Sequence, residues 1–276
     1  MHDFRLASPA RALCAFLAVV LVASAHPQTA PANTPDAAGN DAFLDHAARL
    51  YYSSAKAGLS GFDCALHPDW RALYAAKNGG TVSAGNQPNV DALNSVAIAL
   101  HARMAGGSTL DWNPPARQFD GDTSKLLNSM HDATNQTVQG FMQFWTPFVD
   151  GSVVPGNSDG LDVTTTGDSG KRIHVAQKDI DLVEVFDGGL ILREYDVTMG
   201  ATRIDVTPTF SPSDQGLLIT HFHALIHQGD ASQQEMNVEV AYQSLAGIPI
   251  PSRLDMEVTG VSAFHFTLDS CTVNRK

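Results

Sequence analysis

The sequence is poor in basic residues, since 17 Lys and Arg stand against 29 Asp and Glu and the net charge is −12 with histidine neutral. Removing the N-terminal segment discussed below takes away two arginines and one aspartate, which makes the net charge more negative by one. Nucleic acids and anionic membrane surfaces both attract positive patches. The shortage of basic side chains therefore argues against nucleic acid or an anionic membrane as a partner.

The sequence also lacks the familiar short motifs of catalysis. It contains no nucleophile elbow, no phosphate-binding glycine loop, no His-Glu-x-x-His helix and no Cys-x-x-Cys pair. Two acidic pairs, Asp179 with Asp181 and Asp255 with Glu257, have the i, i+2 spacing of the solvated side of a strand. We therefore expect a binding protein rather than an enzyme, and we expect no cofactor.

Long apolar runs are absent except near the start of the chain. Arg5 and Arg11 precede the apolar run Ala12–Ala25, which ends in the small-x-small pattern Ala23-Ser24-Ala25. These features predict a secretory signal peptide over residues 1–25. The run is too short to serve as a stable transmembrane anchor, so we expect a periplasmic or secreted protein. Residues 26–40 are rich in Pro, Ala and Asn and predict a flexible linker.

Only three cysteines occur, and Cys64 and Cys271 are the two that follow the predicted signal peptide. An exported chain can oxidise them to a disulfide. Cys64 has the parity of the apolar side of its strand, whereas Cys271 has the parity of the polar side. Pairing therefore requires a β-bulge near Cys271. Two separate buried thiols remain the alternative.

Residues 41–276 predict one domain with few helices and many strands. Apolar residues at helical spacing predict a helix over Asp41–Lys56 and a second over Asp122–Thr146, which Pro147 ends. Trp70–Ala76 has the length of a short third helix. Strict alternation over Val96–Met104, a Gly-Gly turn and a returning strand predict a hairpin.

The sequence after Gly160 predicts short strands separated by turns. Each of these strands has one apolar and one polar side. Phe222 and Ile226, for example, alternate with His221, His223 and His227. A wide sheet with one apolar face needs a cover, and only two or three helices are available. The fold class is therefore α+β: a curved antiparallel β-sheet, or half-barrel, wrapped around two or three helices.

This pattern resembles the superfamily of outer-membrane lipoprotein carriers (LolA/LolB-like). Three segments carry the resemblance: the first helix followed by Gly58–Phe62, Phe210 with Gly216–Thr220, and Val240–Gln243 followed by Gly247–Pro251. The resemblance implies a hydrophobic cavity between sheet and helices that holds an acyl chain of a lipid or lipoprotein. No functional residue of that family is carried over to this sequence.

Apolar side chains on the inner sides of the predicted elements are the candidate lipid-binding residues. Burial of apolar ligand surface is the expected source of affinity. The aromatic end of the second helix is the wall of the predicted cavity, although the same aromatic residues are equally ordinary in a filled core. The candidates are Val96, Ile98, Leu100, Phe141, Trp145, Phe222, Ile226, Val240, Tyr242, Met256 and Phe266.

Two alternatives remain open. His221, His223 and His227 lie on one side of one strand, and histidines at i, i+2 can share a transition metal, so a cupin-like metal-dependent enzyme is one alternative. Parity argues against it, because the opposite side is apolar and the imidazoles are expected to face water. The other alternative is a non-catalytic interaction module whose core is filled by its own helices.

Overall fold

The computed structural model describes residues 37–76, 80–104, 107–151, 153–167, 169–229, 232–259 and 262–276. The predicted signal peptide and most of the predicted linker lie outside these residues. The described helices are α2 (Ala37–Leu50), α3 (Trp70–Ala76), α4 (Gln87–Asn94) and α5 (Gly121–Asp150). The strands are β1 (Leu59–Pro68), β2 (Ala97–Arg103), β3 (Gly107–Asn113), β4 (Asp162–Thr165), β5 (Lys171–Gln177), β6 (Ile180–Phe186), β7 (Leu192–Met199), β8 (Thr202–Ser213), β9 (Gly216–Gln228), β10 (Ser232–Leu245), β11 (Ile248–Val258) and β12 (Ser262–Arg275).

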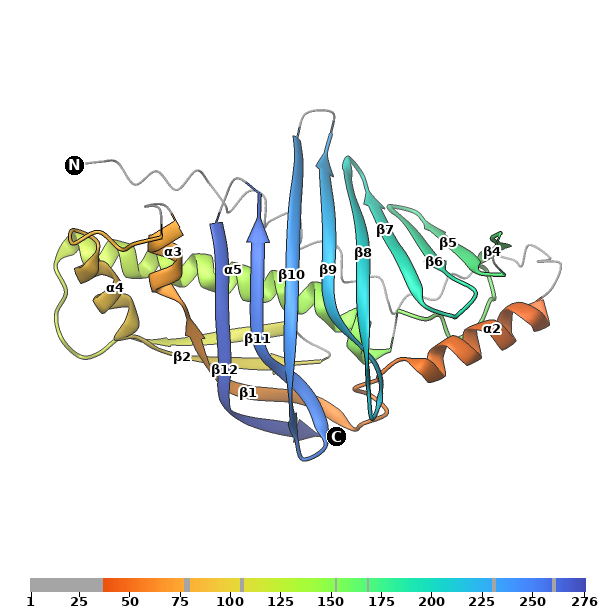
Figure 1. Cartoon of the computed structure of the whole chain (residues 1–276), viewed down its shortest axis with the longest axis horizontal. Coiled ribbons are helices and arrows are strands. Elements are labelled where there is room, and N and C mark those ends of the chain that lie inside the picture. Colours follow the sequence, from red (N-terminus) through yellow and green to blue (C-terminus); the bar gives the residue numbers. More distant parts are fainter. Residues whose placement is uncertain are drawn as a thin grey trace. The chain divides into compact units, whose positions relative to one another are not determined.

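The strands form an antiparallel sheet with the order β3-β2-β1-β12-β11-β10-β9-β8-β7-β6-β5-β4 (Figure 1). The predicted α+β class and the predicted antiparallel sheet are therefore confirmed. The described residues divide into two compact units. Unit 1 comprises Lys56–Gln143 and Val238–Lys276, and unit 2 comprises the described residues up to Ala55 together with Phe144–Asn237. Each unit is described by itself below, and one domain over residues 41–276 stays a prediction.

In unit 1 the predicted hairpin is present, and β2 pairs with β3 from Ala97 opposite Asn113 to Arg103 opposite Gly107. Part of its predicted turn, residues 105 and 106, lies outside the described residues. The α3 helix has the predicted bounds. The α4 helix was not predicted, because its eight residues carry only three buried apolar side chains and begin beside a proline.

The predicted disulfide is present in unit 1, where Cys64 of β1 bonds to Cys271 of β12. Asp63 lies opposite Thr272 and Ala65 lies opposite Asp269, so β12 contains one extra residue at this point. Ser270 in the extra stretch has a φ of 49°. This is the bulge that the opposite parities of the two cysteines required, and it turns Cys271 toward Cys64.

Both predicted ends of the first helix were wrong. We expected α2 to run over Asp41–Lys56, with residues 37–40 in the linker, but it spans Ala37–Leu50. It ends early because Tyr51 forms a parallel bridge with Leu217 of β9, and the N–H of Tyr52 donates to the carbonyl of Leu217 at 3.0 Å. Backbone pairing with the sheet replaces the last helical turn.

The expected end of α5 at Thr146 was also wrong, because the helix continues through Pro147 to Asp150. Proline removes one backbone donor but leaves the later carbonyls free to bond. The Val149 carbonyl accepts from the N–H of Ser54 at 2.6 Å, and the Asp150 carbonyl accepts from the Ser53 hydroxyl at 3.0 Å. These contacts with the segment after α2 hold the last turn in place.

α5 begins at Gly121, one residue before the predicted start at Asp122, and a side-chain cap fixes this start. The Asp120 carboxylate accepts from the N–H of Thr123 at 2.7 Å, as an N-cap side chain does. This hydrogen bond lowers the pKa of the Asp120 carboxyl. Asp120 is therefore the capping residue.

The disulfide leads to a first testable expectation. The two cysteines are separated by 207 positions, and closing so long a loop in the unfolded chain is worth about 5 kcal/mol as an upper figure. The double variant Cys64→Ser, Cys271→Ser should unfold at a lower denaturant concentration than the oxidised protein. Reductant should destabilise the wild type and leave the double variant unchanged. An equal effect of reductant on both proteins contradicts a structural disulfide.

Gly216 leads to a second expectation, because it lies where the segment after α2 crosses the start of β9. Its φ is +115°, and a Cβ here lies 2.8 Å from the Leu50 carbonyl oxygen and from the Tyr52 nitrogen. Gly216→Ala should lower the free energy of unfolding by about 3 kcal/mol through strain and overpacking. Gly200→Ala is the matched control, since its φ is +56° but the space around it is open, and it should cost about 1 kcal/mol. Urea titrations measure the free energy of unfolding of both variants. If the two variants lose the same amount, the backbone is not tightly packed where the segment after α2 crosses β9.

Candidate functional site

Most of the predicted lipid-binding side chains are buried on the apolar side of the sheet. Trp145, Phe222 and Ile226 belong to unit 2, and the others belong to unit 1. Val96 and Tyr242 are partly exposed. The buried members are Ile98, Leu100, Phe141, Trp145, Phe222, Ile226, Val240, Met256 and Phe266.

In unit 2 the last two turns of α5 pack on the sheet through aromatic rings. Phe144 lies 4.4 Å from Phe222 of β9 and 5.7 Å from Phe148, measured between ring centroids. Phe148 in turn contacts Tyr195 of β7 at 5.4 Å and Phe210 of β8 at 6.2 Å. The ring of Tyr51 lies 5.0 Å from that of Phe210. We call these six residues the aromatic cluster: Tyr51, Phe144, Phe148, Tyr195, Phe210 and Phe222.

One carboxyl lies among these apolar side chains. Strand pairing places Glu184 of β6 between Ile173 of β5 and Tyr195 of β7. The same row continues through Val206 of β8 to Ala224 of β9. Glu184 is 2% exposed, and its neighbours in the row other than Tyr195 are equally enclosed. A carboxyl has therefore taken a core position on the apolar face.

Glu184 is electrostatically unusual. Within the part of the chain that the structure describes, its buried Oε2 atom has no hydrogen-bond partner. Burial raises the pKa of Glu184 from 4.5 to about 8, because removing a carboxylate from water penalises its charged form. A strongly shifted pKa at an enclosed position is a recognised mark of functional sites.

Two phenols lie within electrostatic range of Glu184. The Tyr51 hydroxyl donates to the Leu190 carbonyl at 3.1 Å and accepts from the N–H of Leu192 at 2.7 Å. Burial raises the pKa of Tyr51 to about 12, and the nearby Asp187 and Glu184 add to the rise. Burial and the carboxyls of Glu184 and Asp150 likewise raise the pKa of Tyr195.

The segment that follows α2 contributes two further polar groups. The hydroxyls of Tyr52 and Ser54 are buried and lack hydrogen-bond partners among the described residues. Burial raises the pKa of Tyr52 to about 12. Buried polar groups are normally satisfied in proteins. Unit 2 therefore contains three unsatisfied buried polar atoms, on Tyr52, Ser54 and Glu184.

The three-histidine row lies on the other side of β9. His221, His223 and His227 are partly exposed, as the parity of the strand predicted. The Nε2 atom of His223 lies 3.0 Å from Glu235, and that of His227 lies 3.3 Å from Asp205. The imidazoles of His223 and His227 thus point to carboxylates on the two strands that flank β9, which are β10 and β8, and not to a common centre.

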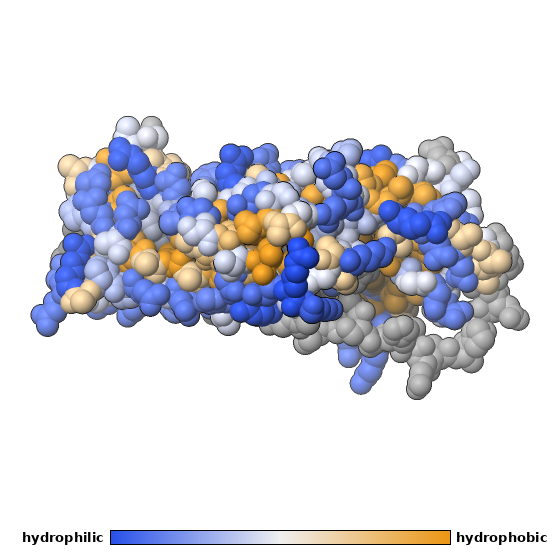
Figure 2. All heavy atoms as spheres, turned by 90° about the horizontal axis from the view of Figure 1, so that it is seen from below, coloured by the Kyte–Doolittle hydropathy of each residue, from blue (hydrophilic) through white to orange (hydrophobic). Residues whose placement is uncertain are grey.

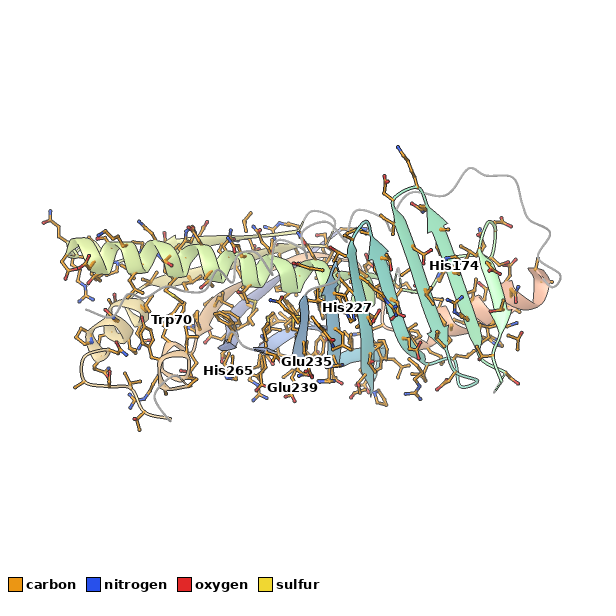
Figure 3. All side chains as sticks on the ribbon, turned by 90° about the horizontal axis from the view of Figure 1, so that it is seen from above. Trp70, His174, His227, Glu235, Glu239 and His265 are labelled. Carbon is orange, nitrogen blue, oxygen red and sulfur yellow. A yellow bond between two sulfur atoms is a disulfide. The ribbon has the colours of Figure 1, made fainter. Side chains whose placement is uncertain are left out.

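The same pairing of histidine with carboxylate recurs on the polar side of unit 1. His265 lies 2.7 Å from Asp255, and His101 lies 2.7 Å from Asp63. The hydrogen bond to Asp63 raises the pKa of His101. Figure 3 shows His265 and Glu239 on the side of their strands that faces away from α5.

No group of three or more metal-ligating side chains is found among the described residues. The predicted metal alternative therefore gains no support from the geometry. His223, His227 and His265 each pair with one acidic side chain. His101 lies between Asp63 and Asp111. Such pairs are typical of a solvated sheet surface.

Sequence reasoning missed Glu184, although a signal was present. Ile180, Leu182 and Phe186 share its parity on β6, and Phe186 packs edge-on against Phe43 of α2 with centroids 6.0 Å apart. Val183 and Val185 on the opposite side obscured the alternation, so the polar side of this strand was not evident. An acidic residue at the parity of Phe186 was the available clue.

The pKa of Glu184 leads to a third expectation. Because the folded-state pKa lies above the value of 4.5 in the unfolded chain, the folded state retains a proton that the unfolded state loses. The free energy of unfolding should therefore fall as the pH rises from about 4.5 to about 8. Glu184→Gln has no such proton and should be more stable than the wild type by about 3 kcal/mol at pH 8, with little difference near pH 4.5.

Denaturant titrations across this pH range measure the effect. Glu194→Gln, at an exposed position of the adjacent strand β7, is the matched control and should follow the wild type throughout. A pH dependence that is identical in the wild type and Glu184→Gln would show that Glu184 ionises normally in the folded state.

Comparison of the sequence with protein-family models finds no matching family, and no significantly similar curated protein is found. Among the described residues, no helix has both the length and the apolar character needed to cross a membrane.

Proposed function

We propose that the protein is an exported carrier that binds a lipid or lipoprotein acyl chain against the apolar side of its sheet, in the manner of the lipoprotein carriers that its sequence resembles. The site in unit 2 is the surface formed by the aromatic cluster and the strands β5 to β9. A half-barrel that wraps around its helices is part of this proposal. Unit 1 carries a second apolar surface of the same type, which includes Leu100, Phe141 and Phe266.

The observation that carries the proposal is the way in which α5 covers the sheet in unit 2. The rings of Phe144 and Phe148 at the helix end lie against rings of the sheet, those of Phe222, Tyr195 and Phe210. These rings present a large apolar area against which an acyl chain can pack. Burial of an acyl chain here would release about 25 cal/mol per Å² of apolar surface.

The apolar side is not closed along its whole length. On β6, Glu184 and Phe186 are buried, whereas Ile180 and Leu182 on the same side are partly exposed. Figure 2 shows apolar side chains that reach the surface in several patches bordered by hydrophilic ones. These exposed apolar groups supply an entry for a chain-like ligand.

Export is supported by two independent features. The N-terminal sequence has the pattern of a signal peptide, and the disulfide between Cys64 and Cys271 is of the kind that forms in oxidising compartments. The strongly acidic composition fits a ligand held by apolar contacts and not by attraction to anionic head groups.

Binding of an uncharged fluorescent apolar probe, N-phenyl-1-naphthylamine, tests the proposal. Ile226→Thr places a hydroxyl on the apolar side of β9 and should weaken probe binding several-fold. His227→Thr changes the adjacent residue on the polar side and should leave binding unchanged. Circular dichroism confirms that both variants are folded. Equal affinities in the two variants would exclude this side of β9 as the site.

Native mass spectrometry of gently purified protein provides the complementary measurement. A carrier should retain additional mass of lipid size, which organic extraction releases. A clean mass of the free chain together with no probe binding contradicts the proposal. That result favours an interaction module with a filled core.

A further inference from the structure

The Glu184 end of the aromatic cluster has a chemical character that the rest of the apolar surface lacks. Glu184 is enclosed, and its Oε2 atom has no hydrogen-bond partner among the described residues. It lies opposite Tyr195 in the strand pairing, and the Tyr195 ring contacts Phe148 of α5. A buried acceptor without a donor is costly unless something else supplies one.

Negative charge acts on Tyr195, the neighbour of Glu184 in the strand pairing. The long helix α5 ends at Asp150, and its last turn contains no basic residue. The negative end of the helix dipole is therefore not compensated from within the helix. Asp150 and Glu184 both raise the pKa of Tyr195, so the charges of both carboxyls act on the Tyr195 hydroxyl.

The nearest basic side chain on β7 is already engaged. Both Nε and Nη2 of Arg193 bond to Asp187 Oδ2, at 2.8 Å and 2.7 Å. Asp187 also accepts from the N–H groups of Gly189 and Ile191. Arg193 is thus held at the turn between β6 and β7 and belongs to a different ion pair.

Aromatic rings complete the arrangement. The rings of Tyr195 and Phe148 lie 5.4 Å apart at a steep angle of 60°, and Tyr51 and Phe210 form a second edge-on pair at 5.0 Å. A carboxylate beside such rings is the combination that recognises ammonium groups, because the ring faces attract cations and the carboxylate supplies the countercharge. The same rings also contact an apolar chain.

We propose that Glu184, with Tyr195, Phe148 and Tyr51, forms a subsite for an ammonium group, so that the ligand is an amphiphile with a cationic amine head and an apolar chain. This inference rests on the proposed function and narrows it to one head-group chemistry. The chain lies along the aromatic cluster, and the ammonium group donates to the unpartnered oxygen of Glu184. The free folded protein retains the Glu184 proton up to about pH 8. Binding of the ammonium group releases this proton to solvent, because the cation offsets the cost of burying the carboxylate.

Three ligands with the same chain test the head group: dodecylammonium, dodecanol and dodecanoate, each kept below its micelle concentration. Isothermal titration calorimetry with the disulfide-bonded, folded chain measures the affinities. The wild type should bind dodecylammonium at least tenfold more tightly than dodecanoate. Glu184→Gln should lose at least tenfold in affinity for dodecylammonium and should bind dodecanol as the wild type does.

Two further variants separate the subsite from general effects. Glu194→Gln removes an exposed carboxyl from β7 and should behave as the wild type. Tyr195→Leu keeps an apolar side chain but removes the ring, and it should weaken dodecylammonium binding several-fold while retaining dodecanol binding. This variant tests the subsite independently if Glu184→Gln does not fold.

The outcomes distinguish this inference from the proposed function. Equal binding of all three ligands, with no change in Glu184→Gln, overturns the ammonium subsite and leaves the acyl-chain carrier intact. Preference for dodecanoate likewise overturns the subsite. Failure of the wild type to bind any of the three overturns both proposals.

Discussion

The structure depends on one constraint: an antiparallel sheet with a continuous apolar side must be covered. Among the described helices α5 is the longest, with 30 residues, and its seam of apolar residues matches that task. In unit 2 the segment after α2 completes the cover. It pairs with β9 instead of continuing the helix, and it donates hydrogen bonds to the carbonyls of Val149 and Asp150. The position of the aromatic cluster follows from these few backbone contacts.

Much of this arrangement was predictable from the sequence because strand periodicity is a local signal. The strands after Gly160, the hairpin of β2 and β3, the apolar seam of α5 and the direction of the β9 histidines all follow from alternation. The bulge near Cys271 followed from parity alone, once a disulfide to Cys64 was assumed. Apart from the bulge, these predictions needed no knowledge of distant contacts.

The errors occurred where a distant part of the chain decides a local conformation. Nothing in the sequence around Tyr51 indicates that β9 will compete for its backbone. Likewise, nothing around Pro147 indicates that Ser53 and Ser54 will bond the carbonyls of the turn that follows it. Glu184 was missed for a related reason, because β6 has apolar residues on both sides and the buried side becomes evident only when Phe43 of α2 packs on Phe186. Glu184, the most distinctive polar group of unit 2, therefore could not be identified from the alternation of apolar and polar residues.

The pairing of imidazoles with carboxylates on the polar side has a consequence for the whole molecule. The chain carries eleven histidines and a net charge of −12 with all of them neutral. Pairs such as His223 with Glu235 and His265 with Asp255 place part of this acidic charge in hydrogen bonds between neighbouring strands. The net negative charge makes copies of the protein repel one another, and added salt weakens this repulsion.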